Sequence, residues 1–288
     1  TTSVMLSDHH SLGAFPISEF GTEEQKQKYL VPLLKGEKLG AFAVTEPSAG
    51  SDLGNQKTTA VDKGDYWLLN GAKIFITNGF YADTYFVTAV TDKSQRNRGI
   101  SAFIVEKGTP GFTFGTKEKK MGIRGSATYE LVFQDCKIPK ENLLGELGKG
   151  FKMALITLDG GRIGVAAQAL GIAQSAIDHC KKYVTEHMQG DQRISQYQFT
   201  QFELADMQTR VDAARLLVYR AAQAKQDHEP FSQLAAMGKL YAAEAATNVT
   251  RRCLQLVGYE GYSRDLPFER LMRCLLYTSD AADEARSV

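Results

Sequence analysis

The chain has 288 residues, of which 43% are hydrophobic and 23% charged, so it is long enough to bury a large core in more than one domain. Thirty-four basic and thirty-three acidic side chains leave a formal net charge of +1, which argues against a nucleic acid or an anionic membrane as partner. The four cysteines are far apart and form no Cys-x-x-Cys pair, so neither a zinc site nor a disulfide framework is expected. No run of eighteen apolar residues indicates a membrane span.

Residues 1–40 have the pattern of short, broken helices. In the run TEEQKQKYLVPLLKG, Thr22 is the expected N-cap and Gln25 stands three positions later, which is the spacing of a capping box. Pro32 inside this run predicts a kink or a second short helix. We interpret residues 1–40 as the remainder of an N-terminal helical domain. The chain starts without a Met, so we also expect its start to be artificial.

The pattern changes to a period of two over residues 41–145. The run YWLLNGAKIFIT places Asn70-Gly71 between two apolar segments, which predicts a hairpin turn there. Further strand patterns follow at regular spacing, in TYFVTAV, ISAFIV, FTFGT and TYELVFQDCKI. These patterns predict a compact, mainly antiparallel β domain. The charged run DKSQRNRG at 92–99 is interpreted as a solvated hairpin loop.

Residues 146–273 predict an antiparallel helical bundle. Apolar residues recur near every 3.5 positions over 163–177, 204–221 and 234–256, and the last run includes Met237 and Tyr241. A fourth helix is expected after Asp265, with Pro267 in its first turn and an apolar side that ends at Arg273. The fold class is therefore α+β and multidomain.

The segment GAFAVTEPSAGSD at 40–52 is the most informative for function. A short apolar strand enters a loop that carries hydroxyls at Thr45, Ser48 and Ser51 and several backbone N–H groups. Such a loop suits phosphate or the polar edge of a ring, although Ser-, Gly- and Pro-rich loops are more often ordinary turns. Taken alone, the segment leaves both interpretations open.

Five segments together resemble the acyl-CoA dehydrogenase family, closest to its short-chain, butyryl-CoA-type members. They are the 40–52 loop, KIFITNG at 73–79, LDGGRIGVAAQALGIAQ at 158–174, QFTQFELADM at 198–207 and GYSRDLPFERLMR at 261–273. The resemblance implies an N-terminal helical domain, a central β domain and a C-terminal four-helix bundle, with FAD between the last two and across a subunit interface. The patterns above predict the same order of domains.

The resemblance also implies which residues contact FAD. Thr77 would donate to the reactive flavin nitrogen and Phe75 would cover one face of the ring, although Thr77 alone reads as a turn residue before Asn78-Gly79. The full implied set is Phe42, Ala43, Val44, Thr45, Ser51, Phe75, Ile76, Thr77, His187, Gln198, Gln255 and Gly258.

Two departures from the family pattern lie at the adenosine end of the cofactor. His187 stands where a pyrophosphate-binding arginine is usual, and Tyr259 replaces the second glycine of a Gln-x-x-Gly-Gly motif. A neutral imidazole binds phosphate less well than a guanidinium, which is always charged. The two departures leave open whether the adenosine end of the site binds FAD as it does in the family.

For the acyl-CoA substrate, the resemblance implies contacts from Ser51, Asp159 and Arg162. From the residues alone, Asp159 is equally an acidic residue near a helix start and Arg162 a solvated arginine. The expected reaction is α,β-dehydrogenation, in which a glutamate removes the α-proton. One of the two positions that the family uses for this base is Gly161 here, and the other lies beyond Arg273.

Residues 274–288 depart from the family altogether. The run CLLYTSDAADE resembles a translated sequencing adapter, so we expect this tail to be non-biological, Glu284 not to be the base, and the fragment to be inactive.

The resemblance further implies electron-transferring flavoprotein as a partner and a homo-oligomer, a dimer of dimers, in the bacterial cytoplasm or the mitochondrial matrix. Three alternatives remain: an acyl-CoA oxidase, a flavin monooxygenase on the same fold, or a non-catalytic flavin-binding relative. No metal is expected, because the histidines have no carboxylate or cysteine at ligand spacing.

Overall fold

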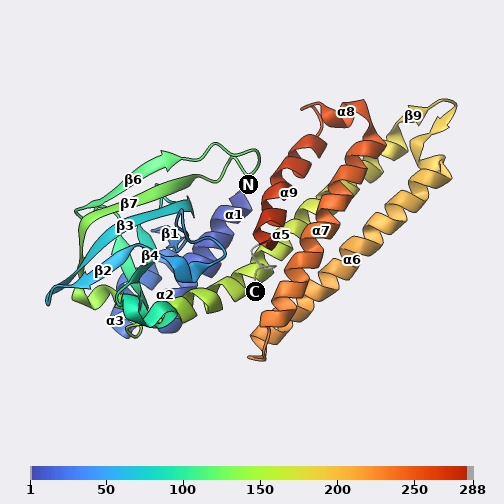
Figure 1. Cartoon of the computed structure of the whole chain (residues 1–288). Coiled ribbons are helices and arrows are strands. Elements are labelled where there is room, and N and C mark those ends of the chain that lie inside the picture. Colours follow the sequence, from blue (N-terminus) through green and yellow to red (C-terminus); the bar gives the residue numbers. More distant parts are fainter. Residues whose placement is uncertain (1, 284–288) are drawn as a thin grey trace. The chain divides into compact units, whose positions relative to one another are not determined.

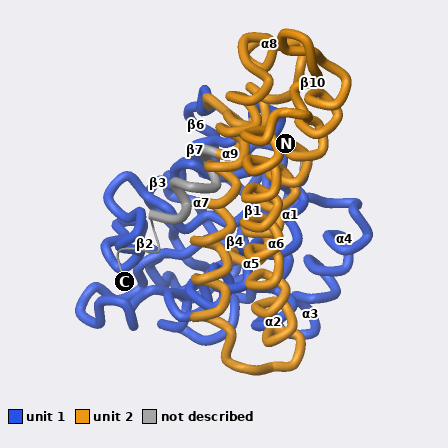
Figure 2. Tube along the Cα trace, turned by 90° about the vertical axis from the view of Figure 1, so that its right-hand side faces the viewer, with its two compact units in different colours: residues 1–119, 124–161 blue, residues 120–123, 162–288 orange. Residues whose placement is uncertain are grey.

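The computed structural model describes residues 2–283, and residues 3–275 with their side chains. The chain divides into two compact units, one formed by residues 1–119 and 124–161 and the other by residues 120–123 and 162–288 (Figure 2). The first unit holds the predicted N-terminal helical segment, the predicted β region and residues 146–161 of the predicted bundle, and the second holds the rest of that bundle. One long helix, α5 (Gly150–Glu186), contributes residues to both units.

Short helical segments precede the sheet in the first unit. They are α1 (Thr2–Ser7), η1 (Asp8–Ala14), α2 (Phe15–Phe20), α3 (Glu23–Gln25), η2 (Lys26–Leu30) and α4 (Val31–Leu34). The predicted capping box is confirmed, because Gln25 N donates to Thr22 Oγ1 at 3.2 Å and Thr22 N donates to Gln25 Oε1 at 3.1 Å. Pro32 lies in the first turn of α4, so the prediction of a further short helix is also confirmed.

An eight-stranded, mainly antiparallel sheet forms the centre of the first unit (Figure 1). Its strand order is β6-β7-β3-β2-β4-β5-β8, and β1 pairs with β4 in parallel. The strands are β1 (Gly40–Ala43), β2 (Thr59–Asp62), β3 (Tyr66–Thr77), β4 (Thr84–Val90), β5 (Ile100–Glu106), β6 (Phe112–Lys117), β7 (Thr128–Pro139) and β8 (Leu143–Leu144). Short 3₁₀ turns, η3 (Leu53–Asn55), η4 (Lys93–Gly99) and η5 (Lys140–Asn142), connect them.

The hairpin turn predicted at Asn70-Gly71 is wrong. The strand β3 continues through both residues, and the turn between β2 and β3 lies at Lys63–Asp65, where Gly64 has φ 88°. Gly71 instead marks a bulge, with φ 146° and a register shift against β7. A Cβ at this position would lie 2.6 Å from Thr58 Cα, so the residue must be glycine because another segment of backbone passes directly over it.

Both faces of the central strands are buried. On one face Tyr85 and Val87 of β4 belong to a cluster with Trp67 and Phe103. On the other face Phe86 stacks on Phe42 with ring centroids 4.9 Å apart, in a cluster that also includes side chains of the short helices and of the first turns of α5. This double burial explains the nearly continuous apolar runs of these strands.

The second unit contains the remainder of α5, α6 (Gln198–Gln226), α7 (Ser232–Val257), α8 (Tyr259–Tyr262) and α9 (Phe268–Asp283), as Figure 1 shows. A small hairpin, β9 (Met188–Gln189) and β10 (Gln192–Arg193), and the turn η6 (Ile194–Gln196) link α5 to α6. The predicted positions Met207, Val211, Ala214 and Val218 of α6 are all buried in one cluster with side chains of α5, α7 and α9. The predicted bundle is confirmed.

Part of the expected core side of α7 is wrong. Met237 is 46% exposed and Tyr241 is also exposed, whereas Ala235, Gly238 and Ala242 are buried. A Cβ on Gly238 would lie 3.5 Å from Val218 Cα, so the backbones of α6 and α7 approach closely here. Small residues permit that approach, and longer side chains face outward as a result.

The last helix extends beyond the expected end of its apolar side at Arg273. The helix α9 runs to Asp283, and Leu275, with 1% of its surface exposed, lies in the bundle core. Cys136, Cys180 and Cys253 are buried, and Cys274 is half-buried. Within residues 2–283, no helix is both long and apolar enough to cross a membrane.

Candidate functional site

The two segments expected to contact a cofactor lie side by side in the first unit. Ile74 N of β3 donates to the Thr45 carbonyl at 2.9 Å, just after β1 ends. Lys73 Nζ donates to the neighbouring Val44 carbonyl at 3.1 Å. Hydrogen bonds from Lys73 and Ile74, which directly precede Phe75–Thr77, thus hold this part of β3 beside Phe42–Thr45. The contact of both segments with a cofactor stays a prediction.

The backbone is strained where β3 ends. Phe75 has φ 58° and Asn78 has φ 61°, and the pairing of β3 with β7 shifts register between Lys73 and Ile76. For an aromatic residue a positive φ costs on the order of 1–2 kcal/mol. The Phe75 side chain is nevertheless 58% exposed, so core packing does not explain the strain. An exposed ring held in this way fits a face-to-ring contact with a ligand.

The loop after β1 has a fixed shape. Glu46 N donates to Ala49 O and Ala49 N donates to Glu46 O, both at 3.0 Å, which closes a tight turn. The Glu46 carboxylate accepts from Lys57 N at 2.6 Å and from Thr58 N at 3.2 Å. Because the Val44 and Thr45 carbonyls and the Glu46 and Ala49 N–H groups already have partners inside the domain, the Thr45 hydroxyl and the remaining N–H groups are what the loop can offer a ligand. Donors of this kind fit the electron-accepting edge of a flavin.

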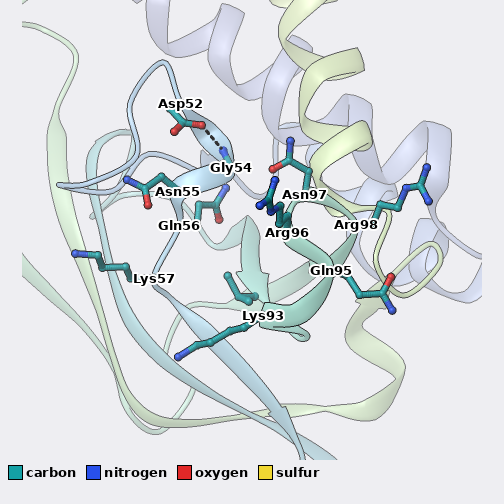
Figure 3. A pocket seen from close by; sticks show the side chains of 11 residues that line it. Asp52, Gly54, Asn55, Gln56, Lys57, Lys93, Gln95, Arg96, Asn97 and Arg98 are labelled. Carbon is teal, nitrogen blue, oxygen red and sulfur yellow. Dashed lines mark hydrogen bonds between the residues drawn. The ribbon is translucent and has the colours of Figure 1, made fainter.

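A strongly basic pocket lies next to this loop, with a volume of about 1020 Å³ (Figure 3). The 52–57 segment forms one wall and η4 the other. Lining it are Asp52, Gly54, Asn55, Gln56, Lys57, Val90, Lys93, Gln95, Arg96, Asn97 and Arg98. Asp52 accepts from Gly54 N at 3.2 Å and is the one carboxylate in a lining that has four cationic side chains. Such a wall favours a ligand with several negative charges.

Sequence reasoning missed this pocket. The charged run at 92–99 indicates a solvated loop, whereas Lys93, Arg96 and Arg98 line a cavity whose other wall lies some forty positions earlier in the chain. Arg96 also has a strained backbone with φ 50°. The available signal was the repeated spacing of cations in a loop that follows a buried strand.

Asp159, Gly161 and Arg162 lie well inside α5. The helix begins at Gly150, so the expectation that Asp159 is near the start of a helix is wrong. The reason is that the Gly-rich segment before it leads directly into the first turns of α5, which pack in the first unit through Met153 and Ala154. A Cβ on Gly161 would meet Leu12 Cδ2 at 2.8 Å, the flexible end of a side chain.

The residues expected at the adenosine end gather at one end of the second unit, the end that carries β9 and α8 in Figure 1. His187 follows α5, Gln198 begins α6, and Gln255 and Gly258 lie at the end of α7. His187 Nδ1 is 2.9 Å from the Tyr183 carbonyl, and its ring stacks on Tyr183 with centroids 3.8 Å apart. These contacts hold the His187 ring against the last turn of α5.

No group of three or more potential metal ligands occurs among the described residues.

Comparison with known proteins agrees with this arrangement. Sequence models of three acyl-CoA dehydrogenase domains match the chain: the N-terminal domain at residues 1–37, the middle domain at 41–136 and the C-terminal domain at 148–279. The short-chain-specific acyl-CoA dehydrogenase of Clostridium acetobutylicum is 53% identical over 273 residues, which cover 95% of this chain and 72% of that protein.

Two solved structures have nearly the same fold. Butyryl-CoA dehydrogenase from Megasphaera elsdenii has a TM-score of 0.95 at 51% identity, covering 99% of this chain and 77% of that one. A chain in a structure of the electron transferring flavoprotein of Acidaminococcus fermentans, from work on flavin-based electron bifurcation, has a TM-score of 0.96 at 54% identity, with 99% and 77% covered. The family models match the helical N-terminal segments, the central sheet and the C-terminal bundle in this order. The chain therefore belongs to the acyl-CoA dehydrogenase family.

Proposed function

We propose that this chain comes from an FAD-dependent, short-chain acyl-CoA dehydrogenase that converts an acyl-CoA thioester to the trans-2-enoyl-CoA and passes the electrons to electron-transferring flavoprotein. The observation that carries the proposal is the hydrogen bond between Ile74 N and the Thr45 carbonyl, which joins the two flavin-contacting segments of the family in one domain. Close similarity to short-chain-specific relatives supports the substrate class.

Bound FAD supplies the two-electron acceptor of this reaction. The chain's own residues would bind and orient it: the Thr45 and Thr77 hydroxyls would donate to the ring edge, and the side chain of Phe75, which is exposed, would cover one face. The residues at the β9 and α8 end of the second unit, which are His187, Gln198, Gln255 and Gly258, would bind the adenosine end of FAD. In the family that end belongs to a cofactor shared between subunits, so we propose a homo-oligomer, a dimer of dimers, as the working form.

The basic pocket suggests where the nucleotide of acyl-CoA binds. Coenzyme A carries a pyrophosphate and a 3′-phosphate, and the pocket presents the cations of Lys57, Lys93, Arg96 and Arg98 beside the loop that contains Ser51. Charge-assisted hydrogen bonds from arginine to phosphate are among the strongest polar interactions in proteins. Ser51, Asp159 and Arg162 would then contact the part of the substrate nearer the thioester.

The proton-abstracting base is not provided at residue 161, because glycine has no side chain to accept a proton. We place the base after Arg273, where this sequence departs from the family; Glu284, which we do not assign to that role, lies outside the described residues.

The experiment that tests the function is flavin uptake. Purified chain mixed with FAD should quench the cofactor's fluorescence and become yellow after desalting. Phe75→Leu should weaken uptake and change the visible band, whereas Phe80→Leu, at another exposed aromatic residue of the same unit, should not. A folded chain that takes up no flavin would refute the proposal. Rapid reaction of the reduced protein with oxygen would instead indicate an oxidase or monooxygenase.

A second experiment tests the pocket. Replacing Arg96 and Arg98 together by glutamine should raise the dissociation constant for butyryl-CoA about tenfold or more for each arginine–phosphate interaction removed, and less at high salt. Binding of the pantetheine thioester, which has no nucleotide, should not change. Lys140→Gln, which removes a lysine paired with Asp62 elsewhere on the sheet, is the control. If the double arginine variant binds butyryl-CoA and the pantetheine thioester with equally reduced affinity, the nucleotide binds outside this pocket.

A further inference from the structure

A buried ion pair lies directly behind the proposed flavin-contacting loop. Lys73 of β3 has none of its surface exposed, and its Nζ is 2.7 Å from Glu46 Oε1, whose side chain is also buried. The same ammonium donates to Gln56 Oε1 at 2.9 Å and lies 3.5 Å from Thr88 Oγ1. Thr88 Oγ1 in turn donates to Gln56 Oε1 at 2.8 Å. Together with the Val44 carbonyl, these groups give every proton of the ammonium an acceptor within the domain.

Stability alone does not account for this pair. Removing two charges from water costs several kcal/mol for each ion, and a buried pair often stabilises a fold no better than apolar residues of the same size. Burial lowers the pKa of Lys73, although the Glu46 carboxylate acts in the opposite direction and raises it. Burial also raises the pKa of Glu46, but the Lys73 charge and the hydrogen bonds from the ammonium, Lys57 and Thr58 outweigh this and hold the pKa below its usual range. The arrangement thus keeps both charges where apolar packing would have served the fold.

The hydrogen bonds of Lys73 are directed at the loop backbone. Three successive residues of the loop are tied to β3: Val44 through its carbonyl to Lys73 Nζ, Thr45 through its carbonyl to Ile74 N, and Glu46 through its carboxylate to Lys73 Nζ. The middle residue, Thr45, carries the hydroxyl that faces a ligand in the proposed function. Two of the three ties depend on one ammonium group.

We propose that Lys73 is a positioning residue for the cofactor: with Glu46 and Gln56 it fixes the backbone of residues 44–46, so that the Thr45 hydroxyl and the neighbouring N–H groups are already aimed at the flavin before it binds. The inference rests on the proposed function for the identity of the ligand. It adds a residue that does not touch the flavin and acts through the loop. Groups held in place in advance bind more tightly because less freedom is lost on binding.

The test removes the pair without leaving a lone buried charge. Lys73→Met alone would strand the Glu46 carboxylate, so the informative variant combines Lys73→Met with Glu46→Gln, in which the amide oxygen still accepts from Lys57 N and Thr58 N. We expect thermal stability near that of the unchanged chain, an FAD dissociation constant raised about tenfold, as for the loss of one charge-assisted hydrogen bond, and a shifted visible band of the bound flavin. Lys140→Met, at a half-exposed lysine paired with Asp62, is the matched control and should change none of these.

The outcomes separate the two proposals. If the unchanged chain takes up no FAD, the proposed function fails and the inference falls with it. If the unchanged chain and the folded double variant bind FAD with the same affinity and spectrum, the positioning role is wrong while the function stands. If the double variant does not fold, Gln56→Leu is tested in its place, because this substitution keeps both charges and removes one acceptor of the Lys73 ammonium. A smaller loss of affinity for FAD would support the positioning role of Lys73. An unchanged affinity for FAD would overturn that role.

Discussion

Replacing Gly71 by alanine should destabilise the first unit far more than the same change at Gly64 or Gly50. The added Cβ would lie 2.5 Å from Thr58 Oγ1 and 2.6 Å from Thr58 Cα, and the latter is backbone that cannot rotate away. Forcing extra volume into a packed site costs about 1–3 kcal/mol, and alanine at φ 146° adds about 1–2 kcal/mol of backbone strain. We therefore expect the free energy of unfolding to fall by about 2–5 kcal/mol.

Two matched substitutions separate these contributions. Gly64 has φ 88° but nothing within 4 Å of an added Cβ, so Gly64→Ala should cost only the backbone part, about 1–2 kcal/mol. Gly50 has open space and no positive φ, so Gly50→Ala should be neutral or stabilise by up to about 1 kcal/mol through the unfolded state.

The assay is urea unfolding followed by tryptophan fluorescence. Trp67 is the chain's one tryptophan and is buried in the first unit, with its ring 5.4 Å from that of Phe103, so its emission reports on that unit. Comparable slopes with urea concentration would show that the same transition is compared throughout. If Gly71→Ala loses no more stability than Gly64→Ala, the close approach to Thr58 does not constrain this strand and the argument is wrong.

Three further predictions concern pH, catalysis and the last helix. Burial lowers the pKa of His9, whose Nδ1 accepts from Gly40 N at 2.9 Å. The unfolded chain therefore binds the proton more readily, and the stability of the fold should decrease as the pH drops below about 6.5. His9→Asn, which keeps an acceptor at this position, should remove this part of the pH dependence in thermal unfolding. Gly161→Glu places a carboxylate where part of the family has its base, and it displaces only the end of the Leu12 side chain. With butyryl-CoA as substrate, the flavin-loaded variant should therefore reduce a dye about 10²–10⁴-fold faster than the parent. A folded, yellow but inactive variant would contradict the assignment of residue 161 as a position for the base. Leu275→Ala should cost about 2–5 kcal/mol of bundle stability in calorimetry if α9 packs as described, whereas a cost near zero would mean that this turn does not contribute.

Short apolar runs predicted the sheet well, because the strands TYFVTAV and ISAFIVE are buried on both faces and this burial is visible in each strand alone. The failure at Asn70-Gly71 has a different origin. A turn motif is local, but a glycine is also required where a second segment of backbone crosses, and Thr58 is thirteen positions away. The turn forms at Gly64 instead, because the pairing of β2 with β3 leaves residues 63–65 between the two strands.

The small-residue side of α7 was hidden for a related reason. Hydrophobic size favours Met237 and Tyr241 as core positions, but the close approach of two helix backbones reverses that preference and buries Gly238 and Ala242. The spacing of apolar residues predicts that a helix forms, but it does not predict how closely the neighbouring helix packs against it.

The site was predicted unevenly. Family motifs identified the loop after β1 and the end of β3, and the fold brings them together. The sequence did not indicate Lys73 or the basic pocket, because a lysine in a strand is ordinarily taken as exposed and a pocket needs two loops that only the fold assembles. Strain at Phe75 likewise depends on a register shift that no single segment encodes.

The distribution of thiols gives the unmodified chain a built-in chemical reporter. Burial raises the pKa of Cys136 to about 12, and Cys180 and Cys253 are enclosed in the bundle, so a maleimide added to the native protein should alkylate Cys274 first. The three slower alkylations would then proceed only through opening of the core around each sulfur. Their separate rates, followed by mass spectrometry, would measure how often the sheet and the bundle each open, without any engineered label.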